Sequence, residues 1–199
     1  MTRIEFWFEF ASTYSYPAAM RIEELAASRG IEVSWHAFLL GPIFNSQGWQ
    51  DSPFNIYPAK GRYMWRDVQR LCQKLDLPFI RPSTFPQNGL LAARIACLNA
   101  QSPWLPEFVR AVYNANFALD RDIASKEVID DCLSAAGQDA ASVIARAELP
   151  DAKNLLRSRT EQATQLGIFG APSFVVGTEL FWGNDRLEDA LDWCSRLRT

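Results

Sequence analysis

The chain has 199 residues, of which 48% are hydrophobic and 13% are aromatic, and its formal net charge is −3. This length and composition are typical of one globular domain, or of a small domain with a large insertion, and they exclude a disordered chain. Acidic and basic residues are mixed along the sequence, which argues against a nucleic-acid partner.

No apolar run approaches the roughly 20 residues that a membrane span needs. The N-terminal MTRIEFWFEF lacks the apolar core and cleavage site of a signal peptide. The four cysteines are far apart in the sequence, form no C-x-x-C motif and each follow a helical apolar pattern: Cys72, Cys97, Cys132 and Cys194. We therefore expect reduced core thiols, a cytoplasmic location and no membrane partner.

The first part of the chain predicts a strand, a helix and a second strand. Apolar residues alternate with other residues over 4–10 and again over 31–37, a period of two that is typical of strands. Between them, apolar residues recur at helical spacing up to Gly30. Because Pro17 fits only the first turn, the helix is predicted to begin between Ser12 and Tyr16. Such a unit predicts parallel strands with a right-handed crossover.

Residues 45–165 show no comparable strand pattern and carry apolar stripes at helical spacing instead. These stripes predict five helices, around residues 64–75, 91–98, 108–113, 128–133 and 155–166. Proline-rich connections such as LPFIRPSTFP separate the predicted helices. The middle of the chain is therefore predicted to be a helical module.

Near the C-terminus, PSFVVGTELFW predicts two short strands joined at Gly177-Thr178, a two-residue hairpin turn. The segment DRLEDALDWCSRL predicts a last helix, with Leu187, Leu191 and either Cys194 or Trp193 facing inward. The order strand–helix–strand, helices, strand–strand–helix is that of an α/β thioredoxin-like fold. We predict a thioredoxin-like domain over residues 1–44 and 166–199. An all-helical domain over residues 45–165 would be inserted between strands two and three.

Ser12 lies in FEFASTYSYP, where the first strand meets the first helix. Free N–H groups and the positive end of the helix dipole favour an anion at such a junction. A serine there is a weak nucleophile without a neighbouring base, but its hydroxyl can donate a hydrogen bond to a thiolate from another molecule. The alternative is that Ser12 only caps the helix.

Two further segments are candidate binding elements. In GIFGAPSFVV, the Ala171-Pro172 bond is either cis and opposite the helix N-terminus, or an ordinary trans bond at the start of an edge strand. In FWGNDR, Asn184 or Asp185 is a candidate cap for the last helix, and Asp185 is also a candidate partner for a ligand ammonium group. The only histidine, His36, lies in a strand pattern and is expected to be structural, so no metal site is predicted.

Six motifs in the same order make the sequence resemble a known family: FEFASTYSY, LGPIFN, NIYPAKGRYMWRD, FPQNGLLAAR, GIFGAPSFVV and FWGNDRL. The sequence resembles the 2-hydroxychromene-2-carboxylate isomerases, which are relatives of the kappa-class glutathione transferases in the DsbA-like branch of thioredoxin folds. The resemblance covers nearly the whole chain. It implies a glutathione cofactor, a small aromatic substrate and a homodimer.

The resemblance also implies roles for individual residues. Ser12 would face the glutathione sulfur, Ala171 before a cis Pro172 would pair with the glutathione backbone, and four residues would line the γ-glutamyl end: Trp182, Gly183, Asn184 and Asp185. Asn55 and Ile56 would lie near the substrate, under an apolar cover suited to Trp49, Phe54, Tyr63 and Phe85. At Asn45 the family leads us to expect a lysine for the substrate carboxylate. The amide keeps a hydrogen bond but loses its charge-assisted part, about 1–2 kcal/mol.

The implied activity is glutathione-dependent cis–trans isomerisation of a conjugated aromatic carboxylate, as part of aromatic-compound breakdown. The alternative is a kappa-class-like glutathione transferase that releases a thioether, and a third reading is a binding protein without turnover. A disulfide oxidoreductase is not expected, because ASTY offers no thiol for a mixed disulfide.

Overall fold

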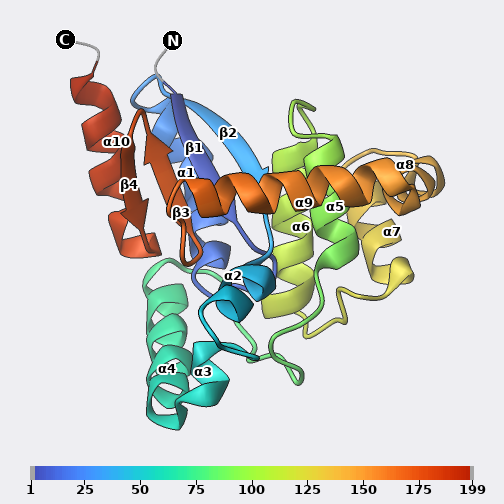
Figure 1. Ribbon diagram of the computed structural model, residues 1–199, viewed down its shortest axis with the longest axis horizontal. Helices are drawn as coiled ribbons and strands as arrows, with labels where there is room; N and C mark the ends of the chain where they lie inside the picture. The colour runs from blue at the N-terminus through green and yellow to red at the C-terminus, as the bar shows by residue number, and fades with distance from the viewer. Residues whose placement is uncertain (1–2, 198–199) are drawn as a thin grey trace.

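A computed structural model describes residues 3–197, and its centre is a four-stranded mixed sheet (Figure 1). β1 (Arg3–Phe8) pairs in parallel with β2 (Glu32–Ala37), and α1 (Ser15–Ala27) connects the two strands. β3 (Ser173–Val176) pairs antiparallel with both β1 and β4 (Glu179–Trp182), which gives the order β2-β1-β3-β4. The thioredoxin-like fold predicted from the sequence is therefore confirmed.

The local predictions for these elements also hold, with small shifts in their ends. β1 ends at Phe8, two residues earlier than the alternation predicted, and α1 begins at Ser15, inside the predicted interval. Gly177-Thr178 joins β3 to β4 as a two-residue turn, with Gly177 at a φ of 62°, a conformation that favours glycine.

One face of the sheet packs an aromatic core against α1 and α10 (Leu187–Arg196). Phe6 lies opposite both Trp35 and Phe174 in the strand register, and its ring centroid is 5.0 Å and 5.5 Å from theirs. On α10, Cys194 is buried whereas Trp193 is 37% exposed, so Cys194 is the inward residue. Aromatic contacts of this kind fix the register of the central strands.

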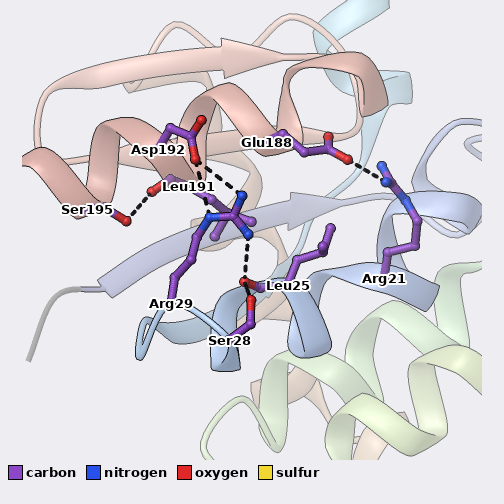
Figure 2. A network of polar contacts seen from close by, with 8 residues as sticks. All are labelled: Arg21, Leu25, Ser28, Arg29, Glu188, Leu191, Asp192 and Ser195. Carbon is purple, nitrogen blue, oxygen red and sulfur yellow. Dashed lines mark hydrogen bonds and ion pairs between the residues drawn. The ribbon is translucent and has the colours of Figure 1, made fainter.

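Ion pairs tie α1 and the turn after it, which contains Arg29, to α10 (Figure 2). Arg21 Nη1 lies 2.6 Å from Glu188 Oε1, and Arg29 Nη2 lies 3.3 Å from Asp192 Oδ1. The two pairs hold the first helix and the last helix side by side, although more than 160 residues separate the partners in the sequence. This arrangement brings the chain after β4 close to the first turns of α1.

The helices between β2 and β3 are α2 (Leu40–Ser46), α3 (Pro53–Ile56), α4 (Pro58–Lys74), α5 (Leu90–Leu98), α6 (Leu105–Phe117), α7 (Lys126–Ala135), α8 (Ala140–Glu148) and α9 (Pro150–Gln165). α5 and α9 contact β2, and α6 packs on α1, so one hydrophobic core continues from the sheet into the helices. α2 already begins before the predicted boundary at residue 45. The division into residues 1–44 with 166–199 and residues 45–165 stays a prediction, and residues 1–2 and 198–199 of it lie outside the described part.

The four cysteines are free and buried, as expected for core thiols. None of the helices in residues 3–197 combines the length and the apolar character that a membrane crossing requires.

Candidate active site

Ser12 lies in the loop between β1 and α1, and its hydroxyl connects two distant parts of the chain. Ser12 Oγ accepts a hydrogen bond from the N–H of Ser15, the first residue of α1, at 3.2 Å. It also donates to the carbonyl oxygen of Ala171 at 2.8 Å. Ser12 therefore meets the first turn of α1 as a cap does, while its proton points to the turn before β3.

The turn before β3 contains a cis peptide bond between Ala171 and Pro172. The N–H of Gly183 donates to the Pro172 carbonyl at 2.9 Å, which fixes this turn to the end of β4. Next to it, the rings of Phe169 and Trp182 lie 4.8 Å apart, and both side chains are about half exposed. The backbone of the turn and an open aromatic surface are thus within reach of a ligand beside Ser12.

The segment after β4 forms a short 3-10 turn, η1 (Asn184–Arg186), which places the predicted γ-glutamyl residues next to α1. Gly183 has a φ of 110°, a conformation that residues with a side chain rarely adopt, and a Cβ there would also lie 2.5 Å from Asp185 Oδ1, so a side chain at this position would be strained. The Asp185 side chain is exposed and lies 3.7 Å from Arg186. Its carboxylate is therefore accessible to a ligand.

The expectation that Asn184 or Asp185 caps the last helix is wrong. Neither η1 nor α10 has a side-chain cap, and the N-cap of α10 is Arg186. The buried Asn184 instead accepts a hydrogen bond from Arg21 Nη2 at 3.2 Å, from across the α1–α10 contact. The Asn184 amide oxygen, which a cap would use as its acceptor, is therefore bonded to the charged Arg21 instead.

Tyr14, two residues after Ser12, was not identified from the sequence. Its hydroxyl donates to Asp67 Oδ2 of α4 at 2.9 Å. Burial, then this hydrogen bond and the charges of Asp67 and Asp185, raise the pKa of Tyr14 well above its usual value. Tyr14 therefore stays protonated and brings α4 against the serine loop. The separation of 53 positions between Tyr14 and Asp67 explains why no local pattern revealed the pair.

Glu9, three residues before Ser12, is a second residue that the sequence did not reveal. Its Oε2 accepts from the N–H of Ala11 at 3.1 Å, and its carbonyl accepts from the N–H of Ser12 and from the hydroxyl of Tyr113. Burial raises the pKa of the Glu9 carboxyl to about 7, against a smaller lowering by the Ala11 hydrogen bond. Glu9 therefore fixes the approach to Ser12 and titrates near neutral pH.

The predicted substrate residues are only partly brought together. Asn55 Nδ2 donates to the carbonyl oxygen of Phe85 at 3.2 Å and also contacts the Asp51 carboxylate, while Ile56 is exposed beside it on α3. Asn45 is exposed on α2, and within residues 3–197 its side chain makes no hydrogen bond. A hydrogen bond thus links Asn55 to Phe85, with Ile56 next to Asn55 in the chain, whereas within residues 3–197 no hydrogen bond joins Asn45 to them.

The aromatic residues expected to cover the substrate do not form one cluster. Phe85 packs edge to face on Trp65 at 4.8 Å, a contact that the sequence did not suggest. Trp49 contacts Phe44 on α2 instead, and Tyr63 is 63% exposed on α4. Of the expected aromatic residues, Phe85 is the one whose carbonyl accepts a hydrogen bond from Asn55.

Among residues 3–197, no group of three or more His, Cys, Asp or Glu side chains could hold a metal ion. His36 stacks on Trp7 with ring centroids 4.6 Å apart, and burial together with the charges of Arg159 and Arg3 lowers its pKa to about 4. A neutral, stacked imidazole fits the structural role expected for it. The functional groups that surround Ser12 are hydroxyls, carboxylates and backbone amides.

Known proteins share this fold and about a quarter of this sequence. A 2-hydroxychromene-2-carboxylate isomerase of Sphingobium xenophagum is 28% identical over 187 residues, covering 93% of this chain and 94% of that protein. Glutathione S-transferase kappa 1 of Homo sapiens is 25% identical over 199 residues, covering 93% of this chain and 87% of that protein. A solved structure of 2-hydroxychromene-2-carboxylate isomerase is 23% identical, covers 98% of this chain and 96% of its own, and superposes with a TM-score of 0.89.

The solved structure supports the fold alone, because its identity is low. The model of the DSBA-like thioredoxin domain matches residues 3–192, which is nearly the whole chain and includes the serine loop, the cis-proline turn and η1. The chain therefore belongs to the family of DSBA-like thioredoxin domains.

Proposed function

We propose that this protein is a glutathione-dependent cis–trans isomerase of a conjugated aromatic carboxylate. The observation that carries the proposal is the position of the Ser12 hydroxyl, at the first turn of α1 and 2.8 Å from the carbonyl before the cis proline. Its relatives are named as isomerases and as kappa glutathione transferases, which supports a reaction that involves glutathione.

The residues around Ser12 fit a tripeptide thiol. The backbone of Ala171, next to Pro172, offers a donor and an acceptor to an extended peptide. The exposed Asp185 carboxylate suits the γ-glutamyl ammonium, and Trp182 and Gly183 would form the surface around it, with the buried Asn184 next to them in the chain. Since Gly183 has no side chain, the backbone there can be approached closely.

Bound glutathione would supply a thiolate that adds reversibly to the conjugated substrate, permits rotation about the former double bond and then leaves. The chain's own part is to stabilise negative charge. The N–H groups at the N-terminus of α1 form the positive end of the helix dipole, and the Ser12 hydroxyl can donate one hydrogen bond to the anion. Asn55, Ile56 and Phe85 would hold the aromatic part of the substrate. At Asn45 an amide would meet the carboxylate where the family leads us to expect a lysine.

Replacing Ser12 by alanine tests this proposal. Ser12→Ala removes the hydroxyl donor and should lower kcat/KM for glutathione-dependent isomerisation of 2-hydroxychromene-2-carboxylate by about 100-fold, the usual cost of losing one donor to a developing anion. The thiolate absorbance of bound glutathione should also fall at neutral pH. Ser28→Ala, which removes an exposed hydroxyl bonded only to a carbonyl of α1, is the matched control. Wild-type turnover by Ser12→Ala, or turnover that persists after glutathione is removed, would refute the proposal.

A second candidate is a kappa-class-like glutathione transferase. It is favoured by Asn45, because this position lacks the cation expected for the carboxylate of an isomerase substrate, and by the kappa relatives. Mass spectrometry after incubation with 1-chloro-2,4-dinitrobenzene and glutathione separates the two candidates: a released thioether supports the transferase. A recycled tripeptide with an isomerised product supports the isomerase.

The homodimer implied by the resemblance and the cytoplasmic location expected from the sequence belong to the same proposal. Analytical ultracentrifugation at micromolar concentration should give a mass of twice 22.5 kDa. A monomer at that concentration would contradict the expected dimer without affecting the assignment of Ser12.

A further inference from the structure

A surface hollow lies on α4 and the segment that follows it, outside the Ser12 site. We call it the arginine hollow and define it by its six lining residues: Arg62, Trp65, Arg66, Gln69, Phe79 and Arg81. Its volume is about 370 Å³, within the range of small-molecule sites. Three of the six residues are cations, two are aromatic, and none is acidic.

The positive charge of the arginine hollow is not compensated by carboxylates. Within residues 3–197, Arg62 makes no side-chain hydrogen bond or ion pair, and Arg66 donates only to the neutral Gln69 amide at 2.8 Å. The Arg81 guanidinium lies 4.9 Å from the Trp65 ring centroid and has no carboxylate partner in the same residues. This differs from other arginines of the chain: Arg21, Arg110 and Arg121 each contact a carboxylate. In a chain of net charge −3, three guanidinium groups around one hollow favour an anion.

The walls of the arginine hollow add a requirement for a flat apolar group. Trp65 and Phe79 are half-buried, with ring centroids 6.4 Å apart and planes inclined by 34°. The Trp65 ring is fixed by its edge-to-face contact with Phe85 and by Arg81 above it. Two fixed aromatic surfaces stack on a planar ring, and guanidinium groups bind a carboxylate through paired hydrogen bonds.

The arginine hollow lies on the opposite side of α4 from the serine loop. Asp67 bonds to Tyr14 beside Ser12, whereas Trp65 and Asp67, two positions apart, point about 200° from each other around the helix. Trp65 still touches Phe85, whose carbonyl accepts from Asn55 in the proposed substrate group. The arginine hollow and the Ser12 site are therefore linked through the contact of Trp65 with Phe85, but they open on opposite sides of α4.

We propose that the arginine hollow is a second binding site, for a planar aromatic carboxylate, whose ring packs on Trp65 and Phe79 and whose anionic group is bound by Arg62, Arg66 and Arg81. This inference does not require the proposed function, since none of its residues belongs to the Ser12 site. The same chemistry is found in an aromatic acid and in the base and phosphate of a nucleotide, so the test includes both.

Isothermal titration calorimetry with 2-naphthoate tests the site. Wild-type protein saturated with S-methylglutathione, which blocks the Ser12 site if glutathione binds there, should bind 2-naphthoate saturably. Arg62→Gln and Arg81→Gln should each weaken this binding by at least about 10-fold, because one charge-assisted contact is lost. The uncharged 2-naphthamide should bind at least about 10-fold more weakly than the acid. AMP in place of 2-naphthoate decides the source: stronger binding of AMP assigns the site to nucleotides.

The matched control is Arg157→Gln, which removes one exposed arginine from α9, away from the arginine hollow, and should leave binding unchanged. Circular dichroism checks that each variant is folded, and Trp65→Leu gives a second measurement if an arginine variant is not. Equal affinity for acid and amide, unchanged affinity in both arginine variants, binding of 2-naphthoate only when S-methylglutathione is left out, or no saturable binding of any probe at millimolar concentration would overturn the inference.

Discussion

Glu9 is the residue of the serine loop whose charge changes near neutral pH. Its pKa is raised to about 7 in the folded chain from an ordinary value of 4.5, so between these values the folded protein holds a proton that the unfolded chain has released. The contribution of this proton to stability is present at low pH and is lost as the pH rises through about 7. The glutamine variant keeps an acceptor for the Ala11 N–H and removes the titration.

We therefore expect that the free energy of unfolding of Glu9→Gln, measured by urea denaturation, does not show this decrease as the pH rises. Relative to the variant, the free energy of unfolding of the wild type should fall by about 1–2 kcal/mol between about pH 5 and pH 7.5. This range takes into account that Glu9 is partly exposed to solvent. His36 contributes the opposite slope, because its lowered pKa makes stability rise from about pH 4 to 6.5. Its effect cancels in the difference between the two proteins. A difference that is constant with pH would show that Glu9 has an ordinary pKa.

At the scale of single residues, the sequence indicates groups that act through local geometry and misses those that act across the fold. Ser12 and Ala171 stand in recognisable junctions, a strand end before a helix and a proline before a strand. Glu9 follows the alternation of a strand, but β1 ends before it and the carboxylate turns back to the Ala11 N–H. Tyr14 meets Asp67 only because α4 folds over the serine loop.

α3 and α4 are the elements whose contact depends on a single glycine. A Cβ on Gly61 would lie 2.2 Å from the backbone carbonyl oxygen of Phe54, which no side-chain rotation can relieve. Gly61→Ala should therefore push α3 from α4, lower the free energy of unfolding by about 1–3 kcal/mol and weaken the Asn55 hydrogen bond to Phe85. Urea denaturation and isomerase activity are the measurements.

Gly41 on α2 is the matched control, because a Cβ there would meet nothing within 4 Å. Gly41→Ala should leave stability unchanged or raise it by up to about 1 kcal/mol through helix propensity. Equal stability of the two alanine variants would mean that α3 and α4 are not held together as closely as described.

Several elements follow from local sequence patterns, although β1 is buried on both faces, with Phe6 and Trp7 each fully buried. Period-two alternation predicted β1 and β2, and Gly177-Thr178 predicted the β3–β4 turn. The cap of α10 could not be predicted, because Arg21, 163 residues earlier, supplies the partner of Asn184. The contact of Trp65 with Phe85 is likewise set by how α4 packs, and not by its own apolar stripe.

The whole molecule keeps its own thiols away from solvent. All four cysteines are buried, and burial raises the pKa of Cys72 and Cys132 to about 11 and of Cys97 to about 12. Ellman's reagent should therefore label no thiol of the native protein within minutes and four thiols in urea. Rapid labelling of the native chain would contradict the packing of these residues. If the native thiols are unreactive, a reactive sulfur at the Ser12 site has to come from a ligand.

The sheet order and the shared core are properties of the whole chain that the sequence supports only through the sequence of elements. β3 inserts between β1 and β4 after a mainly helical segment of more than 130 residues, and that pairing depends on complementary aromatic side chains such as Phe6 and Phe174. The sequence predicted the four strands and most of the helices because amphipathic patterns are local, but it did not predict α2, α3 or α8. It could not predict that α5, α6 and α9 would continue one core with the sheet.

The bond from Ser12 to the Ala171 carbonyl has a consequence for what the protein can select. A hydroxyl has a single proton, so a sulfur ligand must compete with that carbonyl for it. An uncharged sulfhydryl is the weaker acceptor and would lose this competition, whereas a sulfur anion would win it. Ser12 would thus distinguish the thiolate of a ligand from its thiol and donate its hydrogen bond only to the reactive thiolate.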